Sequence, residues 1–394
     1  MSKDEYLITD APLKALTVFA MPMILGSFFQ QVYNMADSII VGQFVGSSAL
    51  AAVGACAALT NVFICVALGA GVGAGVLVSR YFGARDYGKM KTIVSTSLIS
   101  FLVLSILLGV FGFCFSHSMM NLLQTPADIL DEAVLYLRIY FGGILSVMLY
   151  NMGSGILRAV GDSKNPLYFL IVSSITNILL DLLFVIVFDM GIAGVGWATL
   201  IAQTISAVLT LLLLIKTKQE YKVTLKKIRF HKDKLIEIIR LGLPSGIQNG
   251  VVSFSNVIVQ SNINAFGSLA MAGCGAYTKI DGFAILPVMS YSMALTTFTG
   301  QNMGAKKYDR VKQGARSGII MSLLTTIAIS ALLLIFGEQV LSIFSDNPKV
   351  ISYGLYMMHV LAPFYIFLAI SHAFNGIIRG AGITTIPMIV MITC

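Results

Sequence analysis

Long apolar stretches separated by short polar segments dominate the pattern of this chain. A stretch of about 20 mostly apolar residues is the length that a helix needs to cross the hydrocarbon core of a bilayer. On this basis we predict ten membrane-spanning helices, at 13–41, 51–81, 93–115, 133–157, 167–188, 195–215, 236–265, 274–300, 315–336 and 350–378. A final apolar piece at 384–394 is too short to span.

Lys and Arg residues gather in alternate loops between the predicted helices. They occupy the loops after the second, fourth, sixth and eighth helices and are nearly absent from the loops between. Short cytoplasmic loops are enriched in Lys and Arg. The pattern therefore predicts a multi-pass protein of the cell membrane, with the N-terminus and the basic linker at 216–235 in the cytoplasm.

Composition agrees with a membrane protein and excludes an ordinary soluble domain. Hydrophobic residues make up 57% of the 394 positions and charged residues only 11%, far from the balance of a soluble globule. The net charge of +8 could suggest nucleic acid, but the cations lie in the short loops just described. We therefore predict an all-α polytopic membrane protein, with a lipid bilayer and no nucleic acid as partner.

An internal repeat relates the two halves of the chain. The motif at Gly83-Ala84 recurs at Gly304-Ala305, and a second motif at Arg158 recurs at Arg379. Both pairs are separated by 221 positions, from 83 to 304 and from 158 to 379. This offset is far longer than a solenoid period, so it indicates a duplicated bundle.

The duplication predicts two six-helix bundles, at 1–215 and 236–394, joined by the linker at 216–235. An even number of helices per copy gives both copies the same topology, and parallel repeats of this kind surround a central site in transporters that work by alternating access. Cys394 corresponds to Ser173. We therefore expect the second bundle to lack its last two helices and to contain four helices and a truncated fifth.

Polar residues form a stripe in the first predicted helix. Gln30, Asn34 and Asp37 are spaced i, i+4 and i+7, which places them on one helical face. A charge at membrane depth costs a few kcal/mol or more, so an acid there is a functional candidate. The stripe predicts a face directed toward a protein interior or a watery cavity.

The fifth and sixth predicted helices supply possible partners for Asp37. Asn177 and Asp181 are spaced i, i+4 and share a face, and Thr199 lies in the following helix. If these faces meet, their oxygens form the kind of cage that a hard cation such as Na⁺ takes, or the two carboxylates share a proton. The alternative is that Asp181 is a helix-packing residue held by neighbouring polar groups.

The second half has a polar stripe without an acid. It comprises Gln248, Asn249, Ser253, Asn256 and Gln260 in the seventh helix. Uncharged stripes often join helices, though such residues can also line a cavity. Lys279 and Asp281 follow in the eighth helix, two positions apart and therefore not facing each other. Lys279 could pair with Asp37, Asp281 could reach another helix, or both could extend to the interface.

Proline and glycine positions add a mechanical hypothesis. Pro22 and Pro244 occupy equivalent places in the first helix of each repeat and should bend it. Pro22 is either a plain kink or a hinge that responds to the charge state of Asp37. The glycine-rich stretch at 69–75 fits no phosphate-binding motif and is interpreted as close helix packing.

No enzyme active site is evident in the sequence. The four His residues are isolated, without a nucleophile or second metal ligand at motif spacing, and the sequence contains no ATPase module. We therefore expect a protein that is not an enzyme and needs no cofactor, in which an ion gradient drives any active transport.

These residues together resemble the multidrug and toxic compound extrusion (MATE) family. The resemblance covers essentially the whole chain and rests on the following motifs: Pro22, Gln-Gln-Val-Tyr-Asn-Met-Ala-Asp at 30–37, Gly83-Ala, Arg158-Ala-Val-Gly-Asp, Asn177 with Asp181, Gly242-Leu-Pro, and Gly-Gln-Asn-Met-Gly-Ala at 300–305. It implies two six-helix bundles and export of organic cations or amphipathic drugs against Na⁺ or H⁺. Carried over by position, Asp37, Asn177, Asp181 and Thr199 match the family's cation site, and Pro22 matches its bending proline.

The chain departs from one branch of this family at the seventh helix, where 248–253 carries no acid. In this respect it is similar to the DinF-like and related Gram-positive branches. We expect a monomeric cation-coupled antiporter acting across the cytoplasmic membrane. The alternatives are a flippase for lipid-linked oligosaccharides from the same superfamily, which should carry several cavity cations for pyrophosphate, and an inactive truncated transporter.

Overall fold

The computed structural model describes residues 5–393, apart from the side chains of Ser47, Ala58, Val66, Ala67, Leu225, Val257, Asn264 and Ser268. The described chain is helical almost throughout, and each of the ten predicted helices is present. The final residue of the predicted apolar piece at 384–394, Cys394, lies outside the described range.

The first half begins with a short helix, α1 (Tyr6–Thr9), followed by six long helices. These are α2 (Pro12–Ile40), α3 (Ser47–Gly83), α4 (Tyr87–Leu122), α5 (Ala127–Ala159), α6 (Lys164–Leu182) and α7 (Gly191–Lys216). Two π-helical turns, η2 (Val41–Val45) and η3 (Leu183–Val187), continue α2 and α6.

The second half follows the basic linker, which holds the 3₁₀ turn η4 (Leu225–Lys227). Its helices are α8 (Lys232–Asn264), α9 (Ser268–Ala284), α10 (Leu286–Gly304), α11 (Tyr308–Ser342), α12 (Pro348–Leu361), α13 (Tyr365–Gly380) and α14 (Thr385–Thr393). The 3₁₀ turn η5 (Ala362–Phe364) lies between α12 and α13.

Two helices predicted as continuous in the second half are interrupted. Pro287 lies in the first turn of α10, and Pro363 lies in η5. Proline has no backbone N–H and its ring crowds the preceding turn, so the helical hydrogen-bond ladder is broken at both places. The corresponding helices of the first half, α3 and α5, are continuous.

Nine helical stretches of the described residues are long and apolar enough to cross a membrane, by length and composition. Two of these stretches each combine two helices, α9 with α10 and α12 with α13. There are nine stretches and not ten because α8 does not meet the criterion. The polar stripe of α8 lowers its apolar content below that of a typical span.

The helix boundaries repeat with the same offset as the sequence motifs. α3 begins at Ser47 and α9 at Ser268, which is 221 positions later. Backbone conformations repeat as well: Gly46 and Gly267, in the turns before α3 and α9, have φ values of 120° and 91°. A side chain is strained in this left-handed region, so glycine is the residue that each turn requires.

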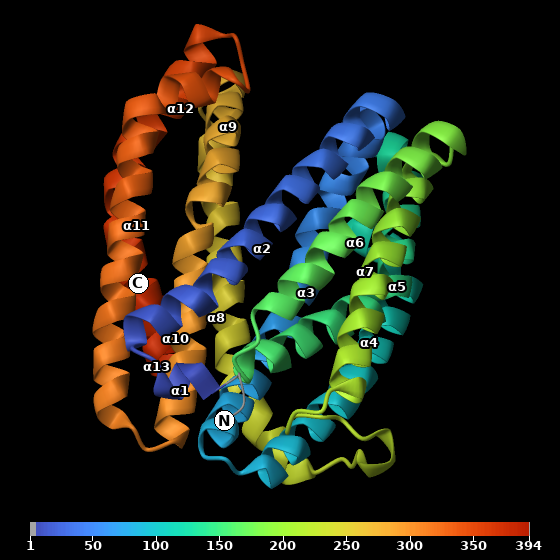
Figure 1. Cartoon of the computed structure of the whole chain (residues 1–394). Helices are drawn as coiled ribbons and strands as arrows, with labels where there is room; N and C mark the ends of the chain where they lie inside the picture. The colour runs from blue at the N-terminus through green and yellow to red at the C-terminus, as the bar shows by residue number, and fades with distance from the viewer. Residues whose placement is uncertain (1–4, 394) are drawn as a thin grey trace.

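The two halves lie side by side at the end of the molecule that holds α1 and diverge toward the other end (Figure 1). Helices α3 to α7 form one group and α9 to α13 the other, while α2 runs between them and contacts both α6 and α10. In the second half, α8 crosses in the same manner and contacts α3 of one group and α9 of the other, as well as α14. The first helix of each half therefore links the two groups.

The N-terminal segment ties the two halves together where they meet. Glu5 forms a 2.8 Å ion pair with Arg85, and the Tyr6 hydroxyl donates to the Gly161 carbonyl at 2.9 Å. On the other side, the Arg310 guanidinium from the second half donates to the carbonyls of residues 7 and 10 at 3.2 and 2.7 Å. Residues 5–10 thus bridge two loops of the first half and the start of α11 in the second.

Candidate functional site

Asp37 and Asp181 are brought together by the packing of α2 against α6. Asp181 is fully buried and Asp37 is half-buried. Their carboxyl groups are within hydrogen-bonding reach of each other. The structure therefore joins the two acids that the sequence analysis proposed as partners.

Asn177 and Thr199 complete this cluster. With the Asn177 amide oriented so that both ends find complementary partners, its nitrogen donates to Asp181 Oδ2 at 3.1 Å and its oxygen accepts from the Thr199 backbone N–H at 3.3 Å. This orientation follows from the hydrogen-bond network. Asn177 and Asp181 lie one turn apart on α6, and Thr199 lies on α7, so three helices build the site.

Oxygen atoms in this cluster lack donors. Asp37 Oδ1 and Asp181 Oδ1 are both buried and, within the described part of the chain, neither receives a hydrogen bond. No Lys, Arg or His side chain of residues 5–393 forms an ion pair with either acid. A buried carboxylate without a partner is strongly unfavourable, so the pair is suited to take up a proton or a cation.

Both acid-bearing helices end in a π-helical turn close to the acids. Asp37 lies four residues before η2, and Asp181 lies two residues before η3. The two turns contact each other, and both contact α7. Single π turns are rare and occur often at functional sites. Helix α8, which occupies the place of α2 in the second half, is not followed by a π turn among the described residues.

Tyrosines surround the acid pair, and the sequence analysis did not identify them. Tyr33 on α2 interacts electrostatically with both acids, and its phenol lies near the Gln203 side chain of α7. Tyr136 on α5 interacts with Asp37. Tyr33 lies four residues before Asp37, which places both on one helical face. That spacing was a usable signal, whereas the approach of Tyr136 depends on tertiary packing.

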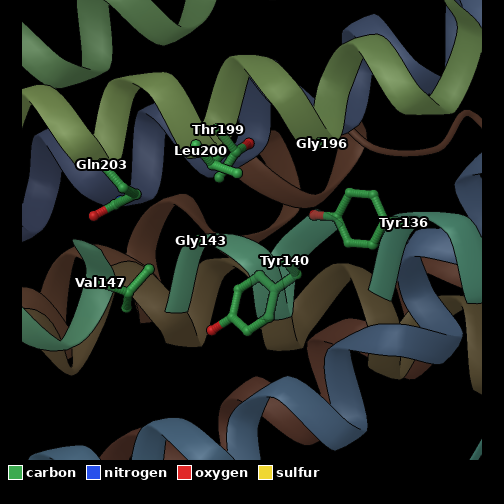
Figure 2. A pocket seen from close by; sticks show the side chains of 8 residues that line it. All are labelled: Tyr136, Tyr140, Gly143, Val147, Gly196, Thr199, Leu200 and Gln203. Atoms are coloured by element: carbon green, nitrogen blue, oxygen red, sulfur yellow. The ribbon is translucent and has the colours of Figure 1, made fainter. Parts of the chain in front are cut away.

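A small cavity lies between α5 and α7 (Figure 2). Its volume is about 10 Å³, roughly the minimum that holds one water molecule. Tyr136, Tyr140, Thr199 and Gln203 supply its polar lining, while Gly143 and Gly196 allow the two helices to approach. An added Cβ at Gly143 would meet Leu200 Cγ at 2.8 Å. Thr199 thus belongs to both the cavity and the acid cluster.

Most of the other polar residues proposed from sequence lie apart from this cluster. Gln30 and Asn34 are exposed on α2. Gln248 is buried and accepts a hydrogen bond from Arg379 at 3.0 Å, and Asn249 is half-buried. Another group, Ser253, Asn256 and Gln260, lines a separate groove formed by α3, α4 and α8.

Lys279 and Asp281 have different surroundings. The Lys279 ammonium lies 5.9 Å from the Phe344 ring centroid and does not pair with an acid among the described residues. Asp281 Oδ1 accepts hydrogen bonds from Tyr277, at 3.4 Å, and from Tyr365. The two phenols also contact each other at 2.7 Å. Asp281 therefore reaches another helix, α13, which was one of the sequence alternatives.

Helix α2 continues through Pro22 in this structure. The residue is half-buried, fifteen positions before Asp37, which is about four turns along a helix. Its proposed function as a hinge stays a prediction.

Comparison with known proteins covers nearly the whole chain. A model of the MatE family matches residues 22–183 and 244–394. The chain is 32% identical over 370 residues to the probable multidrug resistance protein YpnP of Bacillus subtilis, spanning 94% of this chain and 83% of that protein. It is 24% identical over 389 residues to the multidrug export protein MepA of Staphylococcus aureus, spanning 96% and 85%.

Solved structures show the same fold. A MOP superfamily transporter from Pyrococcus furiosus superimposes with a TM-score of 0.94 at 25% identity, covering 100% of this chain and 88% of that one. A structure described as the outward-facing conformation of a multidrug resistance MATE family transporter gives a TM-score of 0.93 at the same identity and coverage. Because the family model matches both halves over most of their length, the chain belongs to the MatE family, the multidrug and toxic compound extrusion transporters, and not to a class of enzymes.

Proposed function

We propose that this protein is a cation-coupled antiporter that exports organic cations or amphipathic drugs across the cytoplasmic membrane. Asp37 and Asp181, with Asn177 and Thr199, form its site for the coupling ion, Na⁺ or H⁺. The observation that carries the proposal is the pair of carboxylates whose buried Oδ1 atoms have no donor within residues 5–393. The names of the relatives YpnP and MepA support drug export.

The oxygen-rich cluster can bind a coupling ion in two ways. Na⁺ is a hard cation that prefers oxygen ligands, and the four residues offer carboxylate, amide and hydroxyl oxygens. A proton placed between the two carboxyl groups would relieve the repulsion between like charges. Either ion removes the cost of burying the unpaired acids, so its arrival and departure change the packing of α2 against α6.

Transport requires that the ion and the drug favour different states of the protein. The π turns that follow both acids place irregular backbone next to the ion site, where a change in packing can pass along α2. Because α2 contacts both groups of helices, its rearrangement acts on their relative position. Separation of the two halves at the end of the molecule that holds α1 then requires breaking the contacts that residues 5–10 make with both halves.

The proposal extends to the family branch, the membrane orientation and the oligomeric state of the protein. We place the chain in a DinF-like, Gram-positive branch because α8 carries no acid beyond its first turns, so the ion site lies in the first half. The alternation of basic loops supports a cytoplasmic N-terminus. We propose that the protein acts as a monomer with bundles at 1–215 and 236–394.

Transport in proteoliposomes tests the proposal. Export of ethidium, a fluorescent organic cation, is measured while the Na⁺ and proton gradients are clamped independently. We expect one gradient to drive export in the wild type and Asp37→Asn to abolish the driven component. Asp309→Asn is the matched control, because Asp309 is an exposed acid on α11 whose side chain is 92% accessible. Driven export in Asp37→Asn at the wild-type rate would contradict the proposal.

A further inference from the structure

A large groove on the side of the molecule is separate from the ion site. It has a volume of about 1430 Å³ and is formed by α3 and α4 of the first half and α8 of the second. Its floor is a crossing of glycines: an added Cβ at Gly242 would meet the Gly69 carbonyl oxygen at 2.7 Å, and one at Gly69 would meet Gly246 Cα at 2.6 Å. The missing side chains let two backbones touch and give the groove its depth.

The α8 side of this groove is apolar toward the start of that helix. Leu235, Ile239, Leu243 and Ile247 line it along one face of α8, while α4 contributes Leu104 and Leu107 together with Ser97 and Ser100. Leu243 is 59% exposed and Leu107 62% exposed, so the lining is open to the surroundings. Leu235 to Ile247 spans about 18 Å of helix, close to the ~15 Å hydrocarbon depth of one leaflet.

Unpaired cations lie at the mouth of the apolar part. Lys232 precedes Leu235 by three residues, one turn back on the groove-lining face, and Arg229 precedes Phe230, which also lines the groove. Arg229 and Lys232 are exposed and form no ion pair with any other described residue. The nearby acids Asp233 and Glu237 are bound by Lys234, at 3.8 and 2.5 Å.

We infer that this groove binds an anionic phospholipid. One acyl chain lies along the apolar face of α8, against α4, and the phosphate contacts Lys232 and Arg229. The cations supply the charge complementarity, because clusters of Lys and Arg next to a membrane helix attract anionic headgroups. An uncharged or cationic occupant would form no ion pair with these two cations. Since α3 and α4 belong to one half and α8 to the other, the bound lipid stabilises the contact between the halves.

Tryptophan quenching provides the test, because the chain contains one tryptophan, Trp197. Trp197 is 44% exposed on α7 and does not line the groove. A reporter is made by combining Trp197→Phe with Leu243→Trp. The reporter and the unmodified protein are each reconstituted into phosphatidylcholine vesicles. Quenching of tryptophan fluorescence is then measured with increasing fractions of chain-brominated phosphatidylglycerol or of chain-brominated phosphatidylcholine.

We expect the apparent affinity of the Leu243→Trp site for brominated phosphatidylglycerol to exceed that for brominated phosphatidylcholine by about fivefold or more, since each contacting cation contributes a factor of about five. Quenching of Trp197 in the unmodified protein should show no preference between the two lipids. Arg229→Gln with Lys232→Gln should abolish the preference, and Lys312→Gln with Arg316→Gln on α11 should leave it unchanged.

Filling the groove gives an independent measurement. Gly246→Leu should also abolish the preference, since an added Cβ there meets only ordinary contacts at 3.7 Å and the rest of the side chain occupies the chain-binding space. Gly142→Leu is the control, because nothing lies within 4 Å of an added Cβ at that exposed position of α5.

Three results would overturn the inference. The first is equal quenching of the Leu243→Trp reporter by both lipids. The second is a phosphatidylglycerol preference that survives Gly246→Leu, which would assign it to the basic surface alone. The third is protection of the reporter by ethidium without any headgroup preference, which would make the groove a drug site.

Discussion

The two halves of this transporter hold the acids inside their helices in opposite ways. In the first half, Asp37 and Asp181 lie against each other, and an oxygen of each is buried without a donor. In the second half, Asp281 Oδ1 accepts from the phenols of Tyr277 and Tyr365. One pair of carboxylates needs a proton or cation, whereas the other carboxylate already has its donors within the protein.

This difference arises within nearly identical layouts. α3 and α9 begin 221 positions apart, at Ser47 and Ser268, and the same offset from Asp37 leads to Ile258 on α8. Layout follows from apolar packing, which many side chains share and which tolerates exchange of one residue. Chemistry follows from a few polar groups, so it can diverge between halves while the backbone repeats.

Removal of the unsatisfied acid should have the largest effect. Asp181→Asn leaves the packing volume nearly unchanged but removes one of two charges, so we expect cation-driven ethidium export to fall by at least about tenfold. Asp281→Asn, the corresponding change in the second half, should keep most of the driven export. Equal losses in proteoliposome assays of the two variants would remove the distinction between the halves.

The second largest effect should come from removing contacts that join the two halves. Arg310→Gln removes charged donors to the carbonyls of residues 7 and 10, and hydrogen bonds to charged groups contribute about 1.5–3 kcal/mol. We expect hydrogen exchange of residues 5–10 to accelerate by about tenfold. Lys312→Gln on the same helix is the control, because its side chain is 82% exposed. Unchanged exchange in Arg310→Gln would show that the segment is held by other contacts.

The phenol cluster of the second half should contribute to stability more than to transport. Tyr365→Phe removes one donor to Asp281, so the free energy of unfolding should fall by about 1–3 kcal/mol while driven export is retained. Denaturant titration in detergent measures the first quantity and proteoliposome transport the second. Tyr356→Phe, at a 72% exposed position of α12, should change neither. Loss of export without loss of stability would assign Asp281 a part in transport.

The smallest expected effect separates the two possible coupling ions. Thr199→Val removes the hydroxyl from the ion site but keeps the backbone N–H that donates to Asn177. If Na⁺ is the ion, loss of one ligand should raise its half-saturating concentration by about two- to fivefold. If protons alone drive export, the proton dependence should stay as in the wild type. Thr176→Val, at a half-buried position of α6 where the hydroxyl donates to the Val172 carbonyl of the same helix, is the control for both.

Much of the ion site could be predicted from spacing. Asn177 and Asp181 lie one turn apart, and Asp37 is an acid inside an apolar helix, so the sequence pointed to all three. Tyr136 and Gln203 could not be found in this way, because each lies on a helix whose position relative to Asp37 depends on packing. The interruptions at Pro287 and Pro363 had a visible signal in the prolines, which the apolar pattern alone did not use.

The sequence by itself determined the helices, the repeat and the family, because apolar length and a fixed offset of 221 positions are properties of the chain. Tertiary structure decided which polar groups meet. Spacing placed Asp281 on α9, but only the packing of α13 brought Tyr365 to its carboxylate. Likewise, Asp37 and Asp181 are 144 positions apart, and only the contact between α2 and α6 joins them. Distances between helices depend on all the side chains that separate them, which no local pattern contains.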